Sequence, residues 1–87
     1  MRIKDGFTLE TKDGQNVIAA KDRSAVLDAT ISLNETSAFL WNLCKDEISK
    51  QQMLEALLES FEMSTVLALS NIDVFIKTMK EYGIIEE

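Results

Sequence analysis

Side chains able to act as nucleophiles or general bases are few in this sequence. There is one cysteine, Cys44, and there is no histidine, so the commonest general base and the commonest metal ligand are both missing. A cysteine reacts as the thiolate, which needs a nearby base or cation. Cys44 instead follows Leu40 and Trp41 at helical spacing. This pattern predicts a small buried apolar side chain and not a catalytic one.

The acidic residues offer no better case for catalysis. Several of them fall at predicted helix starts or on polar helix faces, where water solvates the charge: Glu35, Glu47, Glu55, Glu59 and Glu62. The sequence shows no apolar pocket that would turn one of them into a general acid. We therefore expect a protein that is not an enzyme and that uses no cofactor and no metal ion.

Charge and hydropathy restrict the partners and the location. The net charge is −6, and the nine basic residues are scattered, so a polyphosphate would be repelled. No segment approaches the roughly 18 to 20 continuous apolar residues of a membrane helix. The first residues, MRIKDGF, lack the apolar core of a signal peptide, and one cysteine cannot form an internal disulfide. We expect a cytoplasmic protein with neither nucleic acid nor membrane as a partner.

A strand that runs directly into a helix is the centre of the predicted fold. Thr30 to Leu33 alternates as a short strand, and Asn34 offers a helix N-cap immediately afterwards. The apolar residues from Ala38 to Cys44 cover roughly 200° of the helix that follows. Such a helix must be buried by neighbours on several sides.

A β-hairpin is predicted ahead of this centre. The runs Phe7 to Thr11 and Asn16 to Ala20 flank Asp13-Gly14, a strong signal for a tight hairpin turn. The segment from Lys21 to Asp28 is mixed, and it fits either an extension of the third strand or a packed loop.

Two more helices are predicted behind the central one. Ser49 and Gln52 have the spacing of a capping box, which begins an amphipathic second helix. A third helix is expected from about Thr65 to Tyr82, where Gly83 ends it. The chain should therefore be a single domain over residues 1–87. Its fold class is α+β and winged helix-turn-helix-like, with a three-stranded antiparallel sheet followed by three helices.

The third helix has two stripes without charge. The core stripe is formed by Ala68, Leu69, Ile72, Phe75, Ile76, Met79 and Tyr82. Beside it, four uncharged residues recur at i, i+4, i+7 and i+11, and we call them the uncharged row: Leu67, Asn71, Val74 and Thr78. Together the stripes span about 220°, which is wider than a helix at the edge of a small domain needs. We expect the uncharged row to line a binding surface.

The second and third helices have the lengths of a DNA-reading pair, so a small winged-helix transcriptional regulator is the alternative function. The third helix has no lysine or arginine before Lys77. Phosphates and guanine edges would meet no strong donor there, which argues against this alternative.

Three segments resemble the family of coenzyme PQQ synthesis protein D: Ile31 to Trp41, Met53 to Phe61, and Gly83-Ile84-Ile85. The likeness extends from about Gly6 to Glu87, and its most specific part is the Leu-Asn-Glu-Thr turn with an apolar helix behind it. The resemblance implies a small non-catalytic recognition element. Such a domain binds the leader peptide of a ribosomally made precursor and presents it to a peptide-modifying enzyme, such as a radical SAM maturase.

The resemblance also implies a binding mode. In the family the leader adds as an extra strand beside the third strand, under the third helix, which corresponds here to Thr30 to Leu33 and to Thr65 to Tyr82. Main-chain groups of an open edge supply affinity in such strand addition. The expected peptide-binding residues are Thr30, Ile31, Ser32, Leu33, Leu67, Asn71, Val74, Phe75 and Thr78. A second copy could satisfy the same edge, which would give a homodimer.

Overall fold

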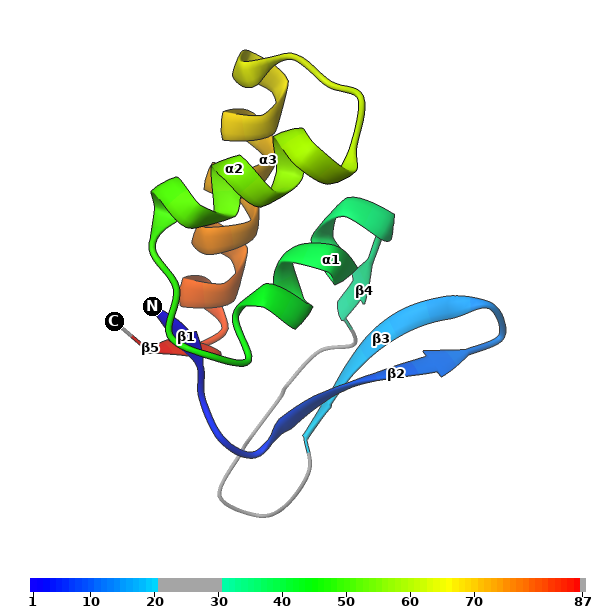
Figure 1. Cartoon of the computed structure of the whole chain (residues 1–87). Coiled ribbons are helices and arrows are strands. Elements are labelled where there is room, and N and C mark those ends of the chain that lie inside the picture. The colour runs from blue at the N-terminus through cyan, green and yellow to red at the C-terminus, as the bar shows by residue number, and fades with distance from the viewer. Residues whose placement is uncertain (21–30, 87) are drawn as a thin grey trace.

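The computed structural model describes residues 1–20 and 31–86. The elements over these residues are β1 (Arg2–Ile3), β2 (Phe7–Lys12), β3 (Gln15–Ala20), β4 (Ile31–Leu33), α1 (Glu35–Leu43), α2 (Lys50–Ser60), α3 (Thr65–Glu81) and β5 (Ile85–Glu86). Strands β2, β3 and β4 form an antiparallel sheet in that order, and three helices follow it (Figure 1). This confirms the predicted α+β class. A separate ribbon of β1 and β5 was not predicted.

The hairpin between β2 and β3 turns at Asp13-Gly14, as predicted. Both residues have positive φ, 52° for Asp13 and 78° for Gly14, which suits the right-handed twist of the flanking strands. The pairing places Leu9, Ile18 and Ile31 across from one another on the inner face of the sheet. Thr30 and the segment from Lys21 to Asp28 lie outside the described residues.

Strand β4 passes into α1 through a single residue, Asn34. Its backbone is extended, and its side-chain Oδ1 accepts a hydrogen bond from the Ser37 backbone N–H at 2.8 Å. This interaction satisfies one of the donors that the first turn of a helix leaves free. The predicted N-cap is therefore confirmed, and no loop separates the strand from the helix.

The other two helices also begin at side-chain caps. Ser49 and Gln52 form the predicted capping box, in which each side chain binds the backbone N–H of the other residue. Ser64 caps α3 by accepting from the Leu67 N–H at 3.1 Å. Gly83 follows the end of α3 with a φ of 68°, which confirms its predicted role.

The core lies where the three helices meet the inner face of the sheet. Its largest fully buried side chains include Trp41 and Leu40 of α1, Met53 of α2 and Ile72 of α3. Cys44 belongs to the same cluster, so the prediction of a buried cysteine is confirmed. Burial raises the pKa of its thiol from 9.0 to about 11.

Tyr82 departs from its predicted place in the core stripe. Its side chain is 41% exposed. The reason is that Tyr82 is the C-cap residue, at the very end of the helix. Tyr82 lies three positions after Met79 and four after Thr78, so helical spacing places it between the core stripe and the uncharged row.

Within the part of the chain that the structure describes, no helix combines the length and the apolar character needed to cross a bilayer.

Candidate functional site

Strand β4 lies at one edge of its sheet. One side pairs with β3, with Ile18 opposite Ile31 and Asn16 opposite Leu33. Among the described residues, no strand pairs with the other side. The side chains alternate as the pleat requires: Ile31 is buried, Ser32 is exposed and Leu33 is half-buried. An unpaired edge of this kind offers its main-chain N–H and C=O groups to an incoming strand.

The uncharged row lies on the surface of α3. Leu67 is 52% exposed and Val74 is 63% exposed, although both are large apolar side chains. They are two helical turns apart on one face, and Asn71 and Thr78 between and beyond them are half-buried. The row therefore exposes two large apolar side chains, Leu67 and Val74, with the polar Asn71 between them. Exposed apolar side chains that share one face mark interaction sites more often than scattered single residues do.

Phe75 beneath the row and Asn71 within it lie deeper than Leu67 and Val74. Phe75, one of the predicted peptide-binding residues, is only 2% exposed and belongs to the core beneath the row. Asn71 is held near Met63, whose sulfur lies 3.9 Å from the Asn71 carboxamide nitrogen. The structure therefore places Phe75 as a support for the row, while Leu67 and Val74 form its accessible surface.

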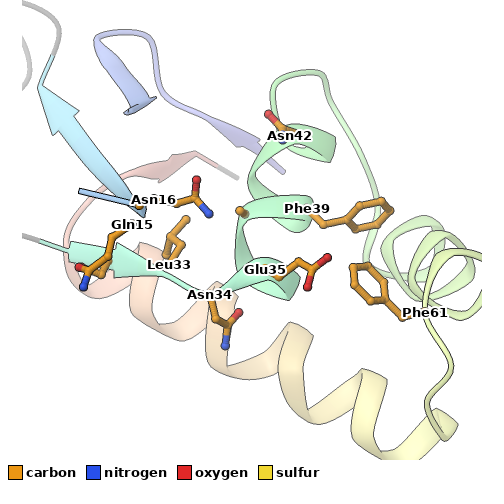
Figure 2. A pocket seen from close by; sticks show the side chains of 11 residues that line it. Gln15, Asn16, Leu33, Asn34, Glu35, Phe39, Asn42 and Phe61 are labelled. Atoms are coloured by element: carbon orange, nitrogen blue, oxygen red, sulfur yellow. The ribbon is translucent and has the colours of Figure 1, made fainter. Parts of the chain in front are cut away.

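Helix α1 connects the strand edge to the helix that carries the row. It follows β4 directly and contacts both β4 and α3. In the view of Figure 2, α3 runs below β4 and below the first turn of α1. The predicted residues of β4 and those of the row on α3 are thus held in place by the same helix, α1. Thr30 is the predicted site residue that lies outside the described residues.

The sequence did not predict a hollow that opens across the outward face of α1 (Figure 2). We call it the α1 hollow. It has a volume of about 710 Å³ and is bounded by the ends of β3 and β4 on one side and by Phe61 on the other. Its lining combines four carboxamides with apolar side chains: Gln15, Asn16, Asn34, Asn42, Leu33, Ala38, Phe39 and Phe61.

Phe39 and Phe61 form the aromatic end of the α1 hollow. Their ring centroids are 5.2 Å apart and the rings are nearly perpendicular, at 84°. This edge-to-face arrangement is one that aromatic pairs prefer. A sequence signal for the hollow does exist, since Ala38 and Asn42 place small or uncharged side chains on the outward face of α1. The aromatic pair has no such signal, because its members come from different parts of the chain.

Comparisons with known proteins agree with this fold. The family model described as coenzyme PQQ synthesis protein D (PqqD) matches residues 16–85. The search among curated proteins gave no match.

Two solved structures are similar over nearly the whole chain. The structure "Lasso peptide synthetase B1 complexed with the leader peptide" has a TM-score of 0.73 and 21% sequence identity, and the match covers 99% of this chain and 96% of that chain. The structure "TbiB1 in Complex with the TbiA(beta) Leader Peptide" has a TM-score of 0.70 and 14% identity, covering 99% and 100%. At these identities the likeness shows a shared fold.

Proposed function

Because the chain belongs to the family of coenzyme PQQ synthesis protein D, we propose that it is a peptide-binding adaptor. It binds the leader segment of a ribosomally made precursor peptide, which adds as a strand to the free edge of β4. The adaptor then presents this precursor to a modifying enzyme. The observation that carries the proposal is the edge of β4 that no described strand pairs with, in a fold shared with two chains whose structures were solved with a leader peptide.

Main-chain hydrogen bonds alone would hold such a guest weakly. A strand beside three residues can make about three or four of them, and each contributes about 0.5 to 1.5 kcal/mol net. A micromolar complex needs about 8 kcal/mol. Side-chain contacts must therefore supply much of the affinity, and Leu67 and Val74 offer apolar surface that a guest can bury.

The chemistry would belong to the partner enzyme. The sequence has no histidine, and its one thiol is buried with a raised pKa, so Cys44 is poorly placed for reaction. The candidate for this partner is a radical SAM maturase, as the family suggests. We place the adaptor and its partner in the cytoplasm.

The test is a titration of the isotope-labelled domain, followed by the amide signals in NMR spectra. The probes are linear peptides selected for binding to the domain from a random display library. We expect the signals of Ile31, Ser32 and Leu33 to shift together with those of Leu67 and Val74. Peptides that bind without moving the β4 signals would refute strand addition.

Duplex DNA and the free protein provide the two other arms of the experiment. Tight binding to DNA at physiological salt, without binding to any peptide, would favour the transcriptional regulator instead. Sedimentation of the free domain across concentration tests whether a second copy occupies the β4 edge. We expect a monomer whose β4 edge is available to the guest.

A further inference from the structure

A groove lies where the start of α2 meets the second half of α3, and we call it the lysine groove. Its volume of about 530 Å³ lies within the roughly 300 to 1,000 Å³ of ordinary ligand sites. It is lined by Lys50 of α2, by Lys77 and Lys80 of α3, and by the apolar residues Met1 and Ile76. Three of the nine basic residues of this acidic protein therefore meet at one concave surface.

The charges in the lysine groove do not cancel. Two acidic residues, Asp73 and Glu81, line it together with the three lysines. The Asp73 carboxylate is already engaged in an ion pair with Lys50. Lys77 forms no ion pair or hydrogen bond with any residue that the structure describes, although Asp73 and Glu81 each lie one turn away from it. An ammonium group can only donate hydrogen bonds, so the position beside Lys77 fits an acceptor with a negative charge.

The lysine groove and the uncharged row lie on different flanks of α3. At about 100° per residue, the α3 residues of the groove and those of the row point in mean directions about 120° apart around the helix. No residue of the row lines the groove, and α2 borders the groove at the Lys50–Asp73 ion pair. A guest held beside β4 and the row would therefore leave the groove open. An adaptor needs such an arrangement, because it has to hold its guest and a second protein at the same time.

We propose that the lysine groove docks an acidic segment of a second protein, which under the proposed function is the modifying enzyme. The identity of that protein rests on the proposed function, and the chemistry of the segment rests on the groove. Carboxylates of the segment would pair with Lys77 and Lys80, and an apolar side chain would cover Ile76. Such charge pairs steer the partner to the surface and fix its orientation. A polyphosphate fits less well, because the net charge of −6 repels it and it cannot use the apolar surface.

The test selects linear peptides from a random display library on the domain whose β4 edge is saturated with a guest peptide. We expect the selected peptides to combine Asp or Glu with apolar residues. They should shift the amide NMR signals of Ile76, Lys77 and Lys80 and leave the β4 signals where the guest has placed them. Lys77→Glu should raise their Kd on the order of tenfold, a loss of about 1.4 kcal/mol, and leave the Kd of the guest unchanged. Position 77 is exposed, and lysine and glutamate are both good helix formers, so the melting temperature should stay near that of the wild type.

The matched control is Lys45→Glu, which makes the same change of charge at an exposed position outside the groove and should leave both Kd values unchanged. A version of the peptide with Asn and Gln in place of Asp and Glu should not bind. The proposal is refuted if the selected peptides are not acidic, if they displace the guest, or if Lys77→Glu binds them like the wild type. It is also refuted if Lys45→Glu weakens them as much, or if inorganic phosphate occupies the groove with the same Kd. If no peptide moves the β4 signals, the proposed function fails instead, and the same selection on the free domain still tests the groove.

Discussion

Two stripes of α3 share an absence of charge, and only one of them is buried. Ala68, Ile72, Phe75 and Met79 are enclosed by the core, while Leu67 and Val74 beside them are more than half exposed. Side-chain type alone does not distinguish the stripes, because both contain large apolar residues. What separates them is whether another element of the same chain lies over them.

A third face of α3, which carries Asp73 and Lys77, differs from both stripes because it is charged. Asp73 on that face forms an ion pair with Lys50 of α2, and Lys77 follows one turn later. This face therefore carries charge where it meets water and α2. Leu67 and Val74 of the uncharged row are instead apolar and mostly exposed, which is typical of a surface that binds a separate molecule.

The largest expected effect comes from a charge in the buried stripe. Ile72→Glu would bury a carboxylate in a fully enclosed site and should cost about 4 kcal/mol or more, close to the whole stability of a small domain. We expect the variant to be unfolded at room temperature in a thermal melt followed by circular dichroism. Labelling of Cys44 by a thiol reagent should become fast. A melt like that of the wild type would show that the stripe is not core.

The same substitution in the row should affect binding and not folding. Val74→Glu adds a charge to a side chain that is already mostly in water, so the melting temperature should stay near that of the wild type. Peptide affinity should fall by about 1 to 3 kcal/mol, because the carboxylate must be desolvated under an apolar guest. A melt as low as that of Ile72→Glu would make the row part of the core. Full affinity would place the peptide site elsewhere.

Alkaline pH probes the buried side without a mutation in α3. Burial holds the pKa of the Cys44 thiol at about 11 in the folded chain, above 9.0 for a free thiol. The unfolded chain therefore loses this proton first, so the contribution of the neutral thiol is complete below about pH 9 and is lost as the pH rises through about 11. Chemical denaturation across this range should show falling stability. Cys44→Ala should show a shallower fall, and an equal fall would mean that other groups cause it.

The smallest expected effect is the loss of the Ser64 cap, which should lower the stability of the whole helix α3 and so affect both stripes equally. Ser64→Ala removes the side chain that caps α3 and leaves the Leu67 N–H without its partner, which should cost about 1 kcal/mol of stability. Peptide affinity measured well below the melting temperature should not change. Ser64→Thr retains a hydroxyl acceptor and should recover most of the loss. If Ser64→Ala weakened binding strongly, the row would depend on helix stability and could not be separated from it.

Signals that act within a few residues could be predicted from the sequence. The Asp13-Gly14 turn, the Asn34 cap and the Ser49–Gln52 capping box each depend on neighbours in the chain, and each was confirmed. The ribbon of β1 and β5 could not be predicted in this way. Its strands have two residues each, which is too short for an alternating pattern, and they come from opposite ends of the chain.

The same difference between local and long-range features applies to the candidate site. The spacing of Leu67 and Val74 indicated the row, and the resemblance indicated the β4 edge, although binding at either stays a prediction. The α1 hollow was not predicted, because Phe39 and Phe61 meet only once α1 and the end of α2 have packed. Tyr82 was misplaced because helical spacing cannot show where neighbouring elements stop covering a helix.

Because Asn34 alone joins β4 to α1, the strand and the helix should move together as a rigid unit. There is no loop to absorb displacement, and the hydrogen bond from Ser37 to Asn34 stiffens the joint. A guest that pulls β4 outward must therefore move α1 with it, and α1 carries much of the lining of the hollow. Strand addition at the β4 edge should therefore slow amide hydrogen exchange in α1 as well as in β4.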